Sequence, residues 1–185
     1  MALLLISAPS AEPITLAEAK NELGVIHDAD DAKILRNIVT ARAEFDGKDG
    51  VLGRCLMPQT WELIYDSFPS GPIKIPLPPL QSIASIKYLD VLGAEQTVPE
   101  TGYAVDPASE PGWVAPATVW PTTYDSINTV RIRFVAGYAN AAAVPKTLIG
   151  AMMLRIQALY NDDWNEAREK AIDSLTFPLR VQLLG

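Results

Sequence analysis

Residues 130–146 read VRIRFVAGYANAAAVPK, and this stretch contains the change of pattern that decides the fold. Over Val130–Ala136 apolar residues alternate with two arginines, which predicts a β-strand with one apolar and one charged face. Soon afterwards Pro145 stands where the first turn of a helix is expected, because the missing amide of proline costs no hydrogen bond there. The chain therefore passes from a strand-rich region into a helical one.

The helix expected after Pro145 has a broad apolar stripe, which predicts burial on more than one side. Asp162 and Asp163 then begin a shorter, polar helix that extends to about Ile172. The remaining segment is apolar, and apolar segments of this kind usually dock against another surface. The apolar stripe of the helix after Pro145 comprises Leu148, Ile149, Met152, Met153, Ile156, Leu159 and Tyr160.

Upstream, residues 58–140 are expected to form strands and turns. Eleven of the 15 prolines fall between Pro58 and Pro121. We expect one small antiparallel unit, with the strands beside the proline segments at its edges because proline cannot donate to a ladder. Besides Val130–Ala136, period-two patterns predict strands at Trp61–Tyr65, Tyr103–Val105 and Trp113–Ala115, and a hairpin of Ile83–Asp90 with Glu95–Val98.

Residues 1–57 are expected to be helical. Thr15 and Glu18 have the spacing of a capping box, so a short helix should begin near Leu16 and end at Gly24. A second, amphipathic helix should follow an acidic start, and three later glycines predict a flexible connection. The acidic residues are Asp28, Asp30 and Asp31, the apolar ones Ile34, Leu35, Ile38, Val39, Ala41 and Phe45, and the glycines Gly47, Gly50 and Gly53.

The expected fold class is therefore α+β. Two N-terminal helices in residues 1–57 and two C-terminal helices in residues 141–185 form one small bundle. A Pro-rich antiparallel β subdomain, residues 58–140, is inserted between them. With 185 residues, of which 49% are hydrophobic, the chain is long enough to form such a core.

Composition excludes several kinds of site. One cysteine, Cys55, cannot form an internal disulfide, and one histidine, His27, makes Cys- or His-based metal sites poor candidates. No apolar run is long enough to span a membrane, and no basic residue precedes the short run Ala2–Ile6, so we expect a soluble chain without an export signal. We assign no catalytic, cofactor-binding or metal-ligating residue.

Weaker chemical signals have simpler structural interpretations. Asp28, Asp30 and Asp31 could ligate a hard cation, but helix capping explains them without a metal. His27 beside Asp28 could be a base and its orienting group, yet no second partner is recognisable. Cys55 beside Arg54 is more typical of buried packing than of a reactive thiol.

Charge argues against a surface that grips nucleic acid. The formal net charge is −7, and none of the three segments carries a net positive charge. Arg131 and Arg133 are a close basic pair on a predicted strand, and we interpret them as a solvated strand face. An acidic protein can still surround DNA, because like charge disfavours adhesion.

Four ordered strings carry a resemblance to a known family. They are Pro13–Lys20 (PITLAEAK), Met57–Trp61 (MPQTW), Phe68–Ile83 (FPSGPIKIPLPPLQSI) and Val130–Tyr138 (VRIRFVAGY), the last leading to Val144-Pro145. In this order and spacing they resemble the head-tail connector, or adaptor, proteins of tailed double-stranded DNA bacteriophages, prophages and gene transfer agents. The resemblance extends over roughly Pro13 to Tyr160.

The resemblance implies a structural role without catalysis or cofactors. Such adaptors form a twelve-fold ring below the portal protein in the virion, extend the DNA channel and join a downstream neck or tail-completion protein. The chain would be made in the bacterial host cytoplasm, could be a monomer before assembly, and would let DNA pass without sequence-specific binding. A C-terminal segment helps related adaptors dock onto the portal, which makes the following residues candidates here: Leu175, Phe177, Leu179, Val181, Leu183 and Leu184.

Two other functions stay open on the residues alone. A carbohydrate- or protein-binding module could line a groove with aromatic side chains, which requires those rings to be exposed and clustered. A hydrolase could use scattered carboxylates, although no convergent set is visible. The aromatic candidates are Trp61, Tyr65, Trp113, Trp120 and Tyr124.

Overall fold

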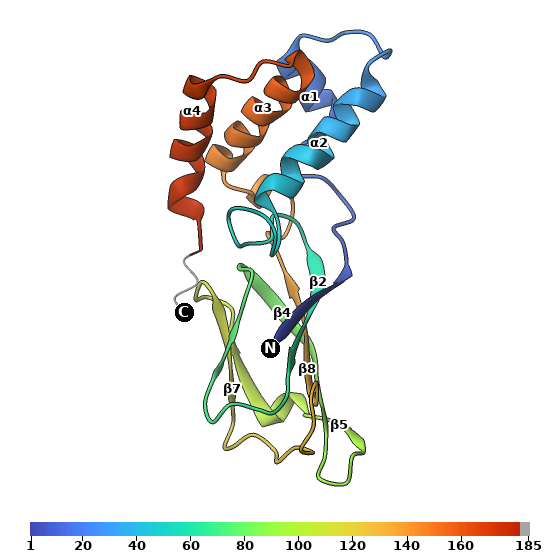
Figure 1. Ribbon diagram of the computed structural model, residues 1–185, viewed down its shortest axis with the longest axis vertical. Coiled ribbons are helices and arrows are strands. Elements are labelled where there is room, and N and C mark those ends of the chain that lie inside the picture. Colours follow the sequence, from blue (N-terminus) through green and yellow to red (C-terminus); the bar gives the residue numbers. More distant parts are fainter. Residues whose placement is uncertain (182–185) are drawn as a thin grey trace. The chain divides into compact units, whose positions relative to one another are not determined.

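The computed structural model describes residues 1–181, and the chain folds into two compact units (Figure 1). The first, called here the β unit, comprises Met1–Pro9 and Pro58–Gly137. The second, the helical unit, comprises Ser10–Met57 and the chain from Tyr138 onward. Because the chain passes between the units three times, each unit is built from segments far apart in the sequence.

The β unit contains a five-stranded antiparallel sheet. Its strands lie in the order β1 (Ala2–Ser7), β2 (Gln59–Tyr65), β8 (Val130–Ala136), β4 (Leu80–Leu89) and β5 (Glu95–Thr97). The predicted alternation in β8 is confirmed, since Val130, Ile132 and Phe134 are buried and its two arginines are exposed. The predicted hairpin is also confirmed, because β4 pairs with β5 around Gly93.

A second sheet of three strands completes the β unit. It has the order β3 (Ile73–Ile75), β7 (Gly112–Pro116) and β6 (Tyr103–Asp106). Buried side chains come from both sheets, for example Phe134 of β8 and Val114 of β7. The expected small antiparallel unit is confirmed, but its strands divide between two sheets, a division that the sequence did not predict. The pairing partner of a strand depends on contacts far along the chain, which the local alternation does not contain.

The prediction that strands beside the proline segments lie at sheet edges is wrong for β2, which lies between β1 and β8. Strand β4 has β8 on one side, but β5 pairs with it only along Lys87–Leu89, so the part of β4 next to Pro79 is an edge. The prolines Pro69, Pro72, Pro76, Pro78 and Pro79 lie in the connections outside the strands, so no ladder position is lost to them. The short strand β3 between these prolines does lie at an edge.

Residues 2–7 form a strand, although the first 57 residues were expected to be helical. Strand β1 pairs antiparallel with β2, with Leu3 opposite Leu63 and Leu5 opposite Trp61. The run Ala2–Ile6 is uniformly apolar and has no period, so its pattern alone does not separate a strand from a helix. Its conformation is set by a partner more than 50 residues further along the chain.

The helical unit consists of α1 (Leu16–Leu23), α2 (Asp31–Phe45), α3 (Lys146–Asn161) and α4 (Glu166–Thr176) (Figure 1). The predicted capping box is confirmed, since the Glu18 amide donates to the Thr15 hydroxyl and the Thr15 amide donates to the Glu18 carboxylate. Gly24 ends α1 in the left-handed conformation, with φ of 69°. Both ends of α1 are therefore fixed by local sequence.

Helix α3 is central to the helical unit, because it contacts α1, α2 and α4. This confirms that its broad apolar stripe is buried on more than one side. Fully or nearly fully buried side chains of this core include Ile34, Ile38 and Phe45 of α2 and Leu148, Met152 and Ile156 of α3.

Helix α4 begins and ends later than predicted. Asp162 has a left-handed φ of 52° at the end of α3, and Asp163 pairs with Arg168, so neither residue starts the next helix. The cap is instead Asn165, whose side-chain oxygen accepts from the Arg168 amide at 2.9 Å. The helix then continues to Thr176, whose hydroxyl donates to the Ile172 carbonyl.

The glycine-rich segment after α2 is a packed loop, not the flexible connection that was predicted. The carboxylate of Asp46 accepts from the Leu56 amide at 2.8 Å, and the Gly47 amide donates to the Arg54 carbonyl at 2.8 Å. Leu52, Cys55 and Leu56 are fully buried within the loop. These contacts bring Gly50 so close to Asp46 that a Cβ atom at position 50 would lie 2.5 Å from its backbone.

Replacing Gly50 should therefore destabilise the helical unit. We expect Gly50→Ala to lower the free energy of unfolding by about 1–3 kcal/mol, as overpacking of a tight site does. Urea denaturation followed by circular dichroism measures the change. Gly71→Ala is the matched control, because no atom lies within 4 Å of its added Cβ. Equal stabilities of the two variants would contradict the proposed close packing.

Candidate assembly surfaces

The acidic residues before α2 are engaged by neighbouring side chains. The Lys20 ammonium lies 2.7 Å from Asp28 and 2.6 Å from Asp31, and the Tyr160 hydroxyl donates to Asp30 at 2.6 Å. The hydrogen bond from Lys20 lowers the pKa of the Asp28 carboxyl below its ordinary value. Asp30 is the residue before the helix, but its side chain makes no capping bond, so the capping interpretation is wrong for it.

The other weak chemical signals do not converge on one site. His27 is exposed, and its Nε2 lies 3.9 Å from the Asp30 carboxylate. Cys55 is buried, as its interpretation as a packing residue requires. Among residues 1–181 no group of three or more His, Cys, Asp or Glu side chains is arranged to hold a metal ion. No helix in this range is both long and apolar enough to cross a membrane.

The aromatic residues do not form the exposed groove that a binding module would need. Trp61 is only 3% exposed, and its indole donates to Gln59 at 3.1 Å. Trp120 stacks on Phe68 with ring centroids 4.8 Å apart and donates to the Gly71 carbonyl. Trp113 is partly exposed, with Lys74 above its ring. The three tryptophans therefore do not share the exposure that this hypothesis requires.

The basic pair on β8, Arg131 and Arg133, also has a structural interpretation. Arg133 donates to the Glu62 carboxylate of β2 at 2.8 Å, directly across the strand pair. Arg131 is exposed on the same face. This confirms the interpretation of the pair as a solvated strand face.

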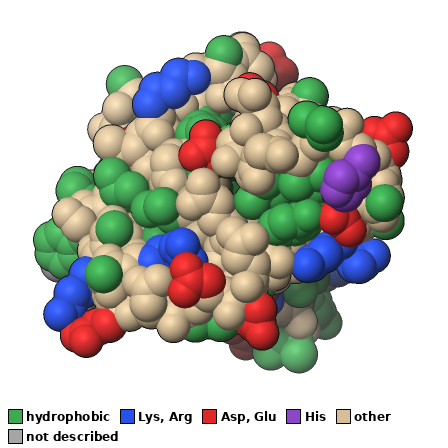
Figure 2. Space-filling view, turned by 90° about the horizontal axis from the view of Figure 1, so that it is seen from above, with side chains coloured by type: hydrophobic (Ala, Val, Ile, Leu, Met, Phe, Trp, Pro, Cys, Tyr) green, Lys and Arg blue, Asp and Glu red, His purple; other side chains and the backbone are tan. Residues whose placement is uncertain are grey.

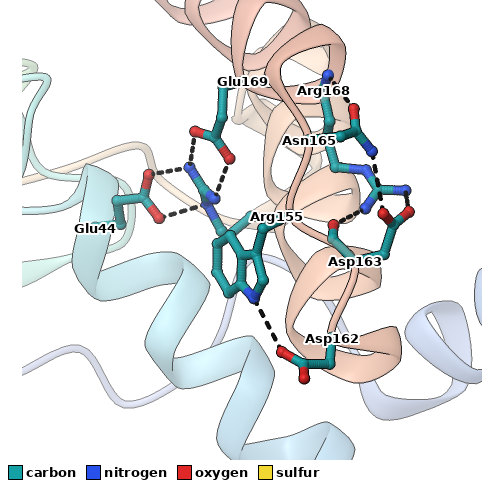
Figure 3. Close-up of polar contacts among 8 residues, drawn as sticks. Glu44, Arg155, Asp162, Asp163, Asn165, Arg168 and Glu169 are labelled. Carbon is teal, nitrogen blue, oxygen red and sulfur yellow. Dashed lines mark hydrogen bonds and ion pairs between the residues drawn. The ribbon is translucent and has the colours of Figure 1, made fainter.

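A buried arginine joins three helices of the helical unit. The guanidinium of Arg155, on α3, makes two hydrogen bonds to Glu169 of α4, at 2.7 and 2.8 Å, and one to Glu44 of α2, at 2.8 Å (Figure 3). The Trp164 ring lies 5.3 Å from it. The hydrogen bonds from Arg155 lower the pKa of Glu169, and the same bonds raise the pKa of Arg155.

No role was predicted for Arg155. The signal was present, since Arg155 is the one charged residue between Lys146 and Asp162 and lies among the residues of the apolar stripe of α3. A single cation in such a stripe predicts a buried partner, but the sequence does not show which acids reach it.

The segment after α4 packs partly on its own unit. It begins with a short 3₁₀ turn, Phe177–Leu179. Arg54 donates to the Leu179 carbonyl at 2.7 Å, and the Val181 amide donates to the Leu52 carbonyl at 2.9 Å. Of the portal-docking candidates, Leu175, Leu179 and Val181 are half-buried, whereas Phe177 is 68% exposed. Leu183 and Leu184 lie outside the described residues.

Two further apolar surfaces are exposed, one on each unit. On the helical unit, hydrophobic side chains gather beside His27, with charged side chains among them (Figure 2). A shallow hollow there is lined by Leu16, Val25 and Ile26, and Ile26 is almost completely exposed. On the β unit, strand β1 presents Leu4, Leu5 and Ile6, each about half exposed.

These features define a two-unit α+β protein whose exposed apolar side chains include groups on a sheet edge, at a helix end and in the turn after α4. No family model matches the chain, and no curated protein matches it. Solved structures do share its fold, and each comparison covers 100% of this chain and 98% of the other.

The similar structures are chains of gene transfer agent particles. One is from the neck of an empty particle computed with C6 symmetry, with a TM-score of 0.83 and 21% identity. Another is from the virion of a native particle, with a TM-score of 0.81 and 22% identity. A third is from the neck of a native particle computed with C12 symmetry, with a TM-score of 0.75 and 20% identity. The whole chain, including both units, therefore has the fold of these particle proteins.

The ion cluster of Arg155, Glu44 and Glu169 should make the stability of the protein depend on pH in a defined direction. Because the folded-state pKa of Glu169 lies below its ordinary value of 4.5, its contribution to stability is present above that pH and is lost as the pH falls through the folded pKa. We expect Glu169→Gln to be less stable than the wild type at pH 7 and to approach it in acid. Thermal denaturation between pH 7 and pH 3 measures this difference.

Glu166→Gln on the same helix is the matched control, because Glu166 forms an exposed pair with Lys170. This control should follow the wild-type curve closely, since exposed ion pairs contribute little. If Glu169→Gln were less stable than the wild type by the same amount at every pH, the stabilising role assigned to the ionised Glu169 would be contradicted.

Proposed function

We propose that this chain is a structural subunit of the head-tail neck of a tailed phage or a phage-like particle. The observation that carries the proposal is the full-length fold match, with a TM-score of 0.83, to a chain from the neck of a gene transfer agent particle. A match over both units is more informative than a match to one unit, because small helical bundles and small β-sheets each occur in many unrelated proteins.

Within the neck we assign the chain the role of the adaptor, a ring below the portal protein that extends the DNA channel and joins a downstream neck or tail-completion protein. The ordered sequence strings support this role. A neck computed with C12 symmetry contains a chain of the same fold, which supports a twelve-fold ring. The subunit would be made in the bacterial host cytoplasm and incorporated into the virion.

The charge of the chain suits a channel through which DNA moves. With a net charge of −7, the subunit should not bind the phosphate backbone tightly, because binding needs cations that replace condensed counterions. In this proposal the protein has a mechanical role and carries out no reaction.

We expect the purified chain to join its portal protein in a stoichiometric complex. Light scattering over a range of concentrations, with and without portal, measures the mass of the species formed. A ring-sized species, or a monomer that joins the portal, supports the proposal. A chain that stays monomeric and indifferent to portal at every concentration would refute it.

Phe177 should contribute to the portal contact, because it is the exposed member of the docking candidates that the structure describes. We expect Phe177→Asp to weaken portal binding at least tenfold, since an aromatic side chain buried at an interface often dominates its energy. Surface plasmon resonance with immobilised portal measures the affinity. Ile26→Asp, at a more exposed apolar position of the same unit, is the control and should bind normally. An unchanged affinity of Phe177→Asp would remove this residue from the contact.

A further inference from the structure

Strand β1 is a sheet edge without the usual protection. Its free side has no strand partner among residues 1–181. Natural proteins protect exposed edges with charged residues, prolines, bulges or very short strands. Ala2–Ser7 is six residues long and contains neither charge nor proline, and its one irregularity lies between Leu5 and Ser7. Such an edge is suited to accept another strand.

The opposite side of the same sheet has a second free edge. Strand β5 pairs with β4 only at Lys87–Leu89, and the Val98 amide donates to the Ile86 carbonyl. The first half of β4, Leu80–Ser85, therefore has no strand beside it on that side within the described part of the chain. This free segment is six residues long, the same length as β1, and its pairing with β8 shifts register between Leu80 and Ser82 and between Ile83 and Ser85.

The free part of β4 lies beside a partly apolar hollow. The hollow is lined by Ile83, Tyr103, Val105 and Pro107 and by the polar residues Gln81, Ser82 and Glu100. An added strand would place alternate side chains into it, as strand addition to a sheet edge does. Strand β1, with four consecutive aliphatic residues, has matching side chains, whereas the exposed strand β5 consists of Glu95, Gln96 and Thr97.

We propose that β1 of one copy pairs with the free edge of β4 of the next copy, so that the five-stranded sheets join side by side around the ring. This inference rests on the proposed function, which supplies the ring. Because the two edges lie on opposite sides of one sheet, the contact is head-to-tail, and a contact of this kind repeats from copy to copy until a rotation closes it.

The direction of the new pair follows from the sheet. Strands β1, β2, β8 and β4 alternate in direction, since all three pairs between them are antiparallel. A sheet that continues into the next copy therefore places β1 antiparallel to β4. In this arrangement the β1 edge of one copy always meets the β4 edge of the next, and neither edge has to pair with a copy of itself.

Cysteine cross-linking tests this contact. Leu4 lies opposite Glu62, Glu62 opposite Arg133, and Arg133 opposite Ser85, so Leu4 and Ser85 are on one face of the sheet. We would prepare the double variants Leu4→Cys/Ser85→Cys and Leu4→Cys/Ser82→Cys, which cover two registers. Within one copy the two strands are three strand spacings apart, about 14 Å, which is too far for a disulfide.

We expect oxidation to give a ladder of covalent multimers beyond the dimer on a non-reducing gel for at least one double variant. Leu4→Cys alone should give no ladder, and Cys55 can remain because it is buried. Leu4→Cys/Leu92→Cys is the matched control. Leu92 lies in the β4–β5 turn and is 88% exposed, so random collisions would cross-link it more readily than Ser85.

The oxidation is carried out on the full chain alone at high concentration and on its complex with portal. A ladder in either sample supports the contact. No ladder in both samples, or an equal ladder in the Leu92 control, overturns it. Portal binding without a ladder in either sample overturns this interface and keeps the proposed function, whereas a ladder without portal binding supports the interface and overturns the proposed function. Dimers from Leu4→Cys alone would indicate pairing of β1 with itself and would also overturn it.

Discussion

The buried guanidinium of Arg155 is the constraint on which the helical unit depends. A charge removed from water costs several kcal/mol unless partners replace its hydration, so α2 and α4 must deliver Glu44 and Glu169 to the same point on α3 (Figure 3). This requirement fixes how α4 lies on the bundle. The 3₁₀ turn that follows α4 then reaches Arg54, whose side chain binds the Leu179 carbonyl. The turn that carries Phe177 therefore follows a helix that this ion cluster ties to the bundle.

The features that the sequence predicted well are those whose cause is local. The capping box at Thr15, the glycine that ends α1 and the alternation along β8 each depend on residues within a few positions of one another. The stripe of α3 predicted burial on several sides for the same reason, since its width can be read from one helix. Fold class followed from these elements, because their order places a β-rich segment between two helical ones.

The features that the sequence missed depend on distant partners. Strand β1 exists because β2 lies beside it, and the β strands divide between two sheets because β3 pairs with β7. Neither pairing can be recognised from a periodic pattern in the sequence of β1 or β3. The same holds for the candidate docking residues. The sequence identifies Phe177 together with its apolar neighbours, and only the structure, in which Leu175, Leu179 and Val181 are half-buried, shows that Phe177 is the exposed one.

The proposed edge-to-edge contact of six residues would also allow an adaptor subunit to stay unassembled until it meets its portal. Each backbone hydrogen bond contributes only about 0.5–1.5 kcal/mol net, and a six-residue strand pair forms few of them. A stable interface usually buries about 1,600 Å² in total, more than one strand pair supplies. Two free copies would therefore separate readily. In the proposed assembly each copy on a portal would gain the docking contact as well as a neighbour on both sides, and because these contacts act together, a ring can be stable where a dimer is not.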